Sequence, residues 1–399
     1  MEIKRENPAS RQTRIAAFVR KNTVLLIALA LAVLSIALVP PDEAYAGYYD
    51  LKTLCCLFGT LAVVCALKNI HFFSILAQRI IVLTGSERTA ALALVYITFI
   101  GSMLIANDMA LITFLPLGYF VFSVTDSKRD MAVVFILQNI AANLGGMLTP
   151  FGNPQNLYLY AHYHIANGEF VSIMFPPFAV SIALITLCCL LLPKRALRIQ
   201  ASQQGQGMRL PPARTAFYLA LFALTILMVF RLLPAWLVLA ILIVSLLIAD
   251  RKALKMVDYC LLLTFVCFFT FAGNMARLAP VRNVFSSLLQ RNTLLTAVLS
   301  CQCISNVPSA ILLSQFTQNY PALLVGVNIG GAGTLIASLA SLITFREFRD
   351  VPYHSFSFHL CYINPFSISQ ISQLSHYLFD TDCQNSYHTL MHKEGVFVL

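Results

Sequence analysis

The chain has 399 residues, of which 58% are hydrophobic and 11% are charged, and its formal net charge is +10. A soluble domain carries about 25% charged residues, so the composition excludes a water-soluble globular protein. Several apolar runs of about 20 residues indicate membrane-spanning helices, whereas a β-barrel would show short alternating segments. The sequence therefore predicts an all-α polytopic membrane protein.

Basic residues gather in short loops that alternate with acidic ones. Six precede the first apolar run, and Asp42, Glu43 and Asp50 follow it. This placement obeys the positive-inside rule, so it favours a multi-pass protein of the plasma membrane over a nucleic-acid partner. Residues 1–22 are predicted to be a cytoplasmic basic N-terminus. The first span is predicted to be a retained signal anchor rather than a cleaved signal peptide.

The first repeat, with its leading span, is predicted to cover 23–193. Apolar runs from Thr23 to Val39 and from Leu51 to Lys68 cross outward and back. An amphipathic piece from His71 to Thr84 is expected at the membrane interface. The run from Thr89 to Val124 is broken at Asn107-Asp108 and again at Pro116. Basic residues flank both of its ends, which predicts a re-entrant hairpin on the cytoplasmic side.

Two more spans complete this half. Met131 to Tyr160 is interrupted from Gly145 through Asn156, and Val171 to Leu192 returns to the cytoplasm. Residues 194–214 are rich in Gln, Gly and Pro, which predicts a flexible cytoplasmic linker.

The second repeat is predicted to cover 215–350 and to keep the same order of pieces in the opposite orientation. Its hairpin, from Ser287 to Asn319, is expected on the outer side, and its last span is broken from Gly330 to Thr334. The spans are Thr215 to Phe230, Ala235 to Ala249, Val257 to Gly273 and Leu323 to Phe345. Charge placement and pattern together predict an inverted-topology repeat with two re-entrant hairpins and two broken transmembrane helices.

The repeat is also visible as a motif. Asn143-Leu144-Gly145-Gly146 with Thr149 recurs, without a gap in register, as Asn328-Ile329-Gly330-Gly331 with Thr334. Residues 351–399 do not repeat the closing span of the first half, because they form an atypical polar C-terminal tail rich in Ser, Gln and His. This tail is either an atypical last span or an altered end of the chain.

The two broken spans are candidate binding segments. Breaking a helix in hydrocarbon frees backbone groups that no water satisfies, so such breaks persist where backbone lines a cavity or binds an ion. Amide and hydroxyl oxygens there are hard ligands suited to Na⁺, and the N-terminal ends of the resumed half-helices would face an anion with free N–H groups. A kinked span whose amides bond neighbouring helices is the structural alternative. The predicted backbone positions are Gly145, Gly146, Gly152, Gly330 and Gly331.

Asp108 is the one acid of 17 that lies inside a long apolar run. An ionisable group at that depth is a functional hypothesis by default: a proton carrier, a cation ligand or a partner for a substrate hydroxyl. A helix cap is the alternative. The corresponding segment of the second half, Ser305-Asn306-Val307-Pro308-Ser309, has an amide and hydroxyls but no acid.

Other chemistry-bearing residues point to membrane packing. The 11 cysteines lie mostly inside apolar runs without two CxxC units, so buried small hydrophobes are predicted rather than a metal site or disulfides. His162 and His164 have no third ligand at metal spacing. Arg277 is expected to extend to the interface rather than to meet an anion.

The pairing of a hairpin tip with a Gly-, Pro- and Asn-rich broken span, twice over, resembles the ion transporter superfamily. This group includes sodium/dicarboxylate symporters, citrate permeases, arsenite permeases and some sodium/proton antiporters. The resemblance covers the chain to about Arg346. It rests on Ala106-Asn107-Asp108-Met109-Ala110, the segment from Leu148 to Asn156, Ser305-Asn306-Val307-Pro308-Ser309 and the segment from Asn328 to Thr334.

The resemblance implies a scaffold domain and a moving transport domain, a homodimer, and a site between the hairpin tips and the broken spans. In dicarboxylate symporters both tips read Ser-Asn-Thr. Here the first tip has Ala106-Asn107-Asp108 and the second has Val307, which is more similar to the arsenite-permease and antiporter branches.

The sequence thus predicts a secondary transporter that moves a small anion, either a carboxylate or an oxyanion, coupled to Na⁺ or H⁺ by alternating access. A sodium/proton antiporter and an inactive remnant are the alternatives. An enzyme is disfavoured because no acid pair, GxS or HExxH motif accompanies Asp108, and no cofactor is expected. The predicted partners are an anionic solute and membrane lipids. The predicted site residues are Asn107, Asp108, Thr149, Asn153, Asn156, Ser305, Asn306 and Thr334.

Overall fold

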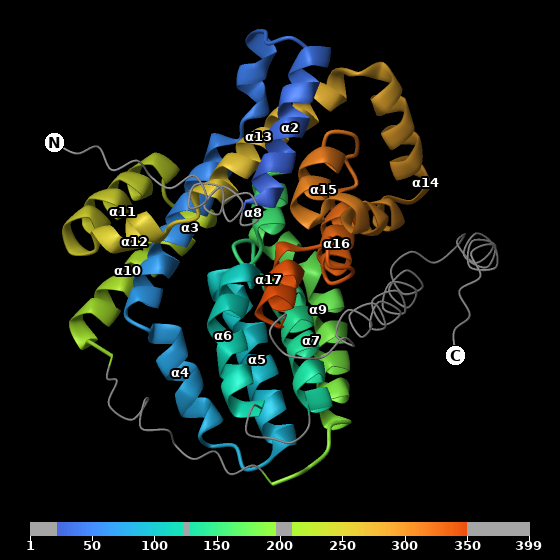
Figure 1. Ribbon diagram of the computed structural model, residues 1–399. Helices are drawn as coiled ribbons and strands as arrows, with labels where there is room; N and C mark the ends of the chain where they lie inside the picture. Colours follow the sequence, from blue (N-terminus) through green and yellow to red (C-terminus); the bar gives the residue numbers. More distant parts are fainter. Residues whose placement is uncertain (1–21, 123–127, 197–209, 349–399) are drawn as a thin grey trace, which may run out of the picture. The chain divides into compact units, whose positions relative to one another are not determined.

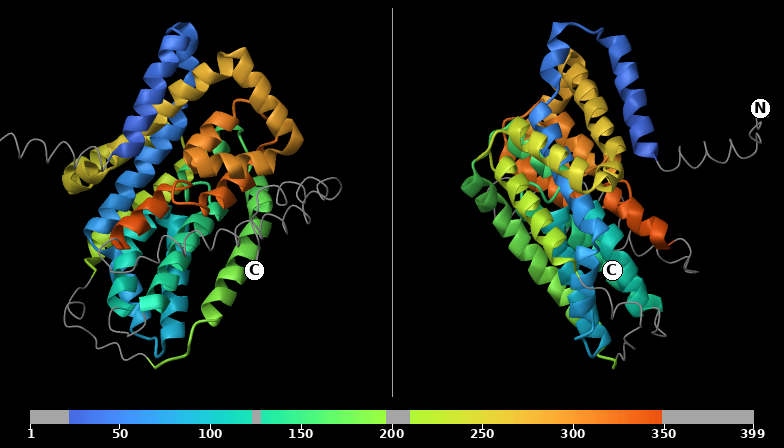
Figure 2. Two further views of the ribbon diagram at one scale, coloured as in Figure 1. Left: turned by 45° about the vertical axis from the view of Figure 1, so that its right-hand side comes forward. Right: turned by 90° about the vertical axis from the view of Figure 1, so that its left-hand side faces the viewer.

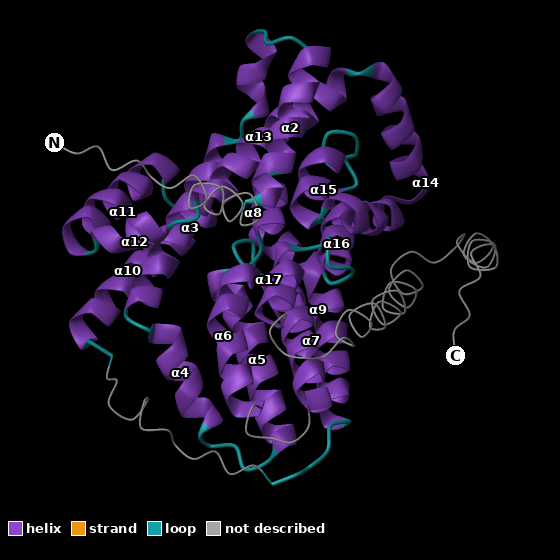
Figure 3. Cartoon of the chain, in the orientation of Figure 1, coloured by secondary structure: helices purple, strands orange, loops and turns teal. Residues whose placement is uncertain are grey.

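The computed structural model describes residues 22–122, 128–196 and 210–348. Within these ranges the chain is built from helices and their connections, without a β-strand (Figure 3). The predicted N-terminal segment, most of the linker and the polar tail from 351 to 399 lie outside the described residues. The all-α polytopic prediction is confirmed, since six described helices are long and apolar enough to cross a membrane: α3, α5, α7, α9, α10 and α13.

In the first half, ten elements lie within residues 22–122 and 128–196, shown from blue to green in Figure 1. Most begin or end within a few residues of the predicted spans. They are α2 (Thr23–Leu38), η1 (Glu43–Tyr48), α3 (Leu51–Asn69), α4 (Phe72–Ile81), α5 (Glu87–Ile105), α6 (Asn107–Phe122), α7 (Lys128–Gly145), η2 (Gly146–Leu148), α8 (Pro154–His162) and α9 (Asn167–Leu190).

In the second half, eight helices lie within residues 210–348. The short helix α12 and the kink in α14 at Asn292 were not predicted. The helices are α10 (Pro212–Val229), α11 (Ala235–Ala249), α12 (Arg251–Met256), α13 (Tyr259–Arg277), α14 (Ala279–Ile304), α15 (Asn306–Leu313), α16 (Tyr320–Gly331) and α17 (Leu339–Phe348).

Polar caps fix where several helices start. The side chain of Asp50 accepts a hydrogen bond from the backbone N–H of Thr53, and Asp258 caps α13 in the same way. Ser86 and Thr89 form a capping box at the start of α5. Such caps satisfy backbone donors that the first helical turn leaves free, so apolar runs begin as helices at defined residues.

Equivalent helices of the two halves pack in equivalent ways. The hairpin arm α5 packs on α7, and its counterpart α14 packs on α16. The second helix of each hairpin contacts a helix of the other half: α6 contacts α17, and α15 contacts α8. Helices α2 and α13 lie side by side at one end (Figures 1 and 2). The hairpin tips and the broken spans therefore meet in the same region.

Two expected break positions are wrong. Pro116 does not end its helix, since α6 continues to Phe122. Proline removes one backbone donor and leaves the carbonyl of Ile112 without its helical partner; both residues line a pocket, where that carbonyl can meet water. Gly330 and Gly331 both remain helical in α16, and the second break runs from 332 to 338.

Candidate functional site

Both hairpin tips turn on a non-glycine residue with a positive φ angle. Ala106 has φ 65° and ψ 152°, and Ser305 has φ 73° and ψ 160°. Side chains rarely adopt this conformation, and it persists where surrounding structure holds it, often at functional sites. The next residue stabilises each tip, because Asn107 Oδ1 accepts from the Asp108 N–H at 2.9 Å and Asn306 Oδ1 accepts from the Val307 N–H at 2.9 Å. The two tips are thus built alike.

Each tip is bonded to the broken span of its own half. Asn107 Nδ2 donates to Asn143 Oδ1 at 3.1 Å, and Thr149 Oγ1 donates to the carbonyl of Met103 at 2.8 Å. In the second half, the backbone N–H of Asn306 donates to the carbonyl of Ala337 at 2.9 Å, and Ser305 Oγ donates to the same carbonyl at 3.2 Å. Each tip therefore forms hydrogen bonds with polar groups of the break in its own half.

Asparagine side chains connect the two broken spans to each other. Asn153 Nδ2 donates to Asn328 Oδ1 at 3.1 Å, and Asn328 Nδ2 donates to Asn156 Oδ1 at 2.5 Å. Asn153 also donates to the carbonyl of Asn143 at 3.0 Å. All four asparagines are buried. Together with Asn107 they form a network, here called the asparagine network, that joins the first tip, the first break and the second broken span.

Glycines allow this close approach. A Cβ atom on Gly145 would lie 2.2 Å from the carbonyl oxygen of Phe99, and one on Gly330 would lie 2.9 Å from Cys301 Cβ. A Cβ on Gly146 or Gly152 would meet the first break itself, and one on Gly331 would lie 2.7 Å from Asn306 Nδ2. The five predicted glycines therefore serve helix contact rather than an unusual φ angle.

Three of the eight predicted site residues keep a buried oxygen without a hydrogen-bond partner among the described residues. These atoms are Asp108 Oδ1, Asn153 Oδ1 and Thr334 Oγ1. Gln155 Oε1, next to Asn153 in the first break, is a fourth. A buried acceptor that lacks a donor is costly. A carboxylate, two amides and a hydroxyl are also the oxygen types that bind hard cations, so these atoms are the candidate ligands.

The other five predicted residues have partners that tie the site together. Asn156 Nδ2 lies 3.2–3.4 Å from the carbonyls of Gly146, Met147 and Thr149. Asn107, Thr149, Ser305 and Asn306 bond tips and breaks as described above. The structure therefore separates residues with free acceptor atoms from residues that hold the backbone in place.

The first turn of α8 offers few donors to an anion. Pro154 has no N–H, and the N–H groups of Asn156 and Leu157 donate to the carbonyl of Asn153 at 3.1 and 3.2 Å. Two N–H groups at this helix start are therefore occupied within the chain, and an anion held there stays a prediction.

Four further residues of the site are not among the eight predicted site residues. Asn143 and Asn328 open the repeated Asn-x-Gly-Gly motif, so their repetition was the available signal. Gln155 Nε2 lies 3.4 Å from Asn328 Oδ1. Gln302, in the last turn of α14, accepts from the N–H of Thr334 at 2.8 Å and donates to the carbonyl of Gly330 at 2.9 Å.

Residues outside this region behave as packing and interface groups. Arg277 forms an ion pair with Asp42 at 2.6 Å. Within the described residues, no three His, Cys, Asp or Glu side chains gather as a metal site, and the cysteines described there are free thiols.

Comparison with known proteins decides the family. A model of the citrate transporter family matches residues 15–325. The chain belongs to the citrate transporter family. This membership fits the resemblance to the ion transporter superfamily and supports the broad assignment as a membrane transporter.

Curated relatives agree with this assignment. The chain is 32% identical to an uncharacterized transporter of Methanocaldococcus jannaschii over 325 residues, which is 81% of this chain and 88% of the relative. It is 27% identical to the inner membrane protein YbiR of Escherichia coli over 77% of this chain and 82% of the relative. A silicon efflux transporter of Oryza sativa subsp. japonica is 30% identical over 37% of this chain and 30% of its own length.

Proposed function

We propose that this citrate transporter family member is a secondary active transporter that moves a small anion, a carboxylate or an oxyanion, coupled to Na⁺ or H⁺. It would work by alternating access in the plasma membrane, with its N-terminus in the cytoplasm and as a homodimer. No covalent chemistry is part of this proposal. Membership of the citrate transporter family supports a transport function. The unpartnered buried oxygen atoms of the candidate site support coupling to a cation.

The single observation that supports coupling to a cation is a set of buried oxygen atoms, unpartnered within the described part of the chain, on the first hairpin tip and on the two breaks. Asp108 Oδ1, Asn153 Oδ1 and Thr334 Oγ1 come from both halves of the chain and lack a donor among the described residues. A Na⁺ ion would satisfy such oxygens without a charged cage. A proton on Asp108 would turn its carboxylate into a donor.

The proposed symport is tested by calorimetric titration of the purified protein. Succinate, citrate, phosphate and arsenite are each titrated with and without Na⁺, and at two pH values. Tighter binding of one anion with Na⁺ or at lower pH supports coupled transport. Anion binding whose affinity changes neither with Na⁺ nor with pH contradicts coupled transport.

A sodium/proton antiporter is the second candidate. It is favoured by the fact that none of the eight predicted site residues carries a positive charge that would hold an anion. Asp108 would then exchange its proton for Na⁺. Sodium entry into proteoliposomes driven by a pH step, without an added anion, would favour the antiporter. Absence of any gradient-driven flux of anion or cation would favour an inactive remnant.

A further inference from the structure

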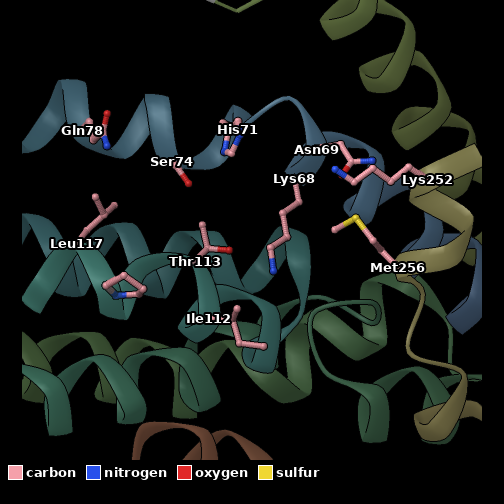
Figure 4. A pocket seen from close by; sticks show the side chains of 11 residues that line it. Lys68, Asn69, His71, Ser74, Gln78, Ile112, Thr113, Leu117, Lys252 and Met256 are labelled. Atoms are coloured by element: carbon pink, nitrogen blue, oxygen red, sulfur yellow. The ribbon is translucent and has the colours of Figure 1, made fainter. Parts of the chain in front are cut away.

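A pocket of about 560 Å³ opens between α3, α4, α6 and α12, apart from the tips and breaks (Figure 4). Its polar lining includes Lys68, Asn69, His71, Thr113 and Lys252. Two lysines from different helices thus face one cavity. We refer to it as the lysine pocket.

Among the residues that the structure describes, the two lysine charges have no ion-pair partner. Lys68 is half-buried and Lys252 is exposed, and neither forms an ion pair with a described residue. Asp250 lies two residues before Lys252 and accepts its hydrogen bonds from neutral groups. Asn69 Nδ2 lies 3.0 and 3.2 Å from its two oxygens, and the Tyr218 hydroxyl and the N–H of Ala253 also donate to it. The two ammonium groups are therefore the charged groups among the described residues that line the pocket.

The turn between α3 and α4 holds this lining in place. His71 starts α4 in the left-handed region, with φ 56° and ψ 26°, and its N–H donates to the carbonyl of Lys68 at 2.9 Å. A non-glycine residue in this region is uncommon and is found where surrounding structure requires it. Here it allows Lys68, Asn69 and His71 to line one wall. In Figure 4 the Lys68 side chain extends from α3 toward Thr113 and Ile112 of α6.

The opposite wall leads toward the candidate site. Ile112 lines the pocket and lies four residues after Asp108 in α6. Residues four apart share one face of a helix and are separated by about 6 Å along its axis. The lysine pocket therefore lies one helical turn from Asp108, on the same face of α6.

We propose that the lysine pocket is a binding subsite for small oxyanions, in which the ammonium groups of Lys68 and Lys252 supply both the positive charge and the hydrogen-bond donors. Ammonium groups bind carboxylate and phosphate oxygens as charge-assisted donors. The subsite supplies the positive charge that the tips and breaks lack. This inference rests on the proposed function, because it takes the bound oxyanion to be the transported solute. The subsite would concentrate that anion at one mouth of the transporter.

The same chemistry would also fit the phosphate headgroup of an anionic lipid. A solute anion binds the protein in detergent without lipid, whereas a lipid headgroup is available only in a membrane that contains that lipid. An experiment in detergent and in vesicles separates them.

The test compares wild type with the double variant Lys68→Gln/Lys252→Gln. Lys255→Gln is the matched control, because it removes a charge from the same short helix without altering the pocket lining. Citrate and inorganic phosphate are titrated into protein in neutral detergent. Charge-assisted bonds of this kind predict about tenfold weaker binding of one of the two probes in the double variant and unchanged binding in the control.

A second arm measures thermal unfolding in vesicles of phosphatidylcholine alone and in vesicles containing equal amounts of phosphatidylglycerol. If the double variant binds both anions normally but loses a stabilisation by phosphatidylglycerol that the control retains, the subsite holds a lipid headgroup. If the double variant matches the control in both arms, the subsite is overturned.

An Asp108→Asn background separates this inference from the proposed function. The lysine effect on anion binding is expected to remain in that background, because the subsite lies a helical turn away. Wild-type protein without gradient-driven flux, but with a lysine-dependent anion site, would reject the transporter and leave the subsite standing.

Discussion

Asn153 of the first broken span donates from Nδ2 to Oδ1 of Asn328 in the second broken span, at 3.1 Å. The two residues are 175 positions apart in the sequence, and both are buried. This bond makes the two halves of the chain share one polar region. The amide N–H groups of Asn153 and Asn328 each donate to two acceptors in this region.

Replacing Asn328 with alanine is expected to destabilise the protein, because Asn153 and Asn156 each lose a buried partner. Leaving buried polar groups unpaired costs about 1–3 kcal/mol for each. Thermal unfolding in detergent should show a clear drop in Tm. The exposed Gln318→Ala variant serves as the control, and equal Tm values for the two variants would contradict a structural role for the network.

Alanine at three glycines should give a graded series. Gly145→Ala would place Cβ 2.2 Å from a backbone oxygen, which cannot move aside, and should destabilise by about 3 kcal/mol. Gly330→Ala meets Cys301 Cβ at 2.9 Å and should cost less. Gly168 has nothing within 4 Å, so its alanine variant should be neutral or slightly stabilising. Chemical or thermal unfolding ranks the three, and a different order would refute the close-packing explanation.

Thr149 and Thr334 occupy matching positions of the repeated motif, yet their valine variants should differ. The hydroxyl of Thr149 donates to the carbonyl of Met103 at 2.8 Å, so Thr149→Val is expected mainly to lower Tm. The hydroxyl of Thr334 lacks a partner among the described residues, so Thr334→Val should keep Tm and weaken cation dependence of transport. Measuring both properties for both variants decides this. A lower Tm in Thr334→Val with normal cation dependence would assign it to structure.

The loop between α2 and α3 contains a pH-sensitive contact. Two hydrogen bonds from the Arg277 guanidinium hold the pKa of Asp42 below its ordinary value of 3.8. A lowered pKa in the folded state stabilises the protein at neutral pH, and this contribution is lost only as the pH falls through the folded value, below 3.8. Asp42→Asn should therefore reduce stability equally from about pH 7 to pH 5 and converge with wild type in more acidic solution. Unfolding measured against pH checks this, and a difference that grows on acidification would contradict it.

The sequence predicts the spans and both hairpin tips well. Long apolar runs and polar interruptions mark these features directly, and the break after Ile105 lies where Asn107 and Asp108 predicted it. The behaviour of Pro116 was not predictable, because a proline is tolerated when its freed carbonyl meets a pocket made by distant helices. Local sequence carries no record of those helices.

The hydrogen-bond partners of the site residues could not be predicted from the sequence either. Thr149 and Thr334 look alike in the motif, and the difference between them depends on which carbonyl each hydroxyl reaches in the folded chain. Asn143 and Asn328 could have been found from their repetition. Gln155 lies inside the predicted first break, where amide oxygens were expected to suit Na⁺. Gln302 could not have been found, because it lies in the last turn of α14 and reaches Thr334 and Gly330 only in the folded chain.

The most direct test of the account is gradient-driven uptake by proteoliposomes containing wild type, Asp108→Asn or Thr334→Val. The probe is whichever anion binds most tightly in the titration series, and the quantity measured is the ratio of uptake with and without an inward Na⁺ or proton gradient. A cation site built from both halves predicts a high ratio for wild type, a ratio near one for Asp108→Asn and a reduced ratio for Thr334→Val. Gradient-driven uptake that is unchanged in both variants would contradict it.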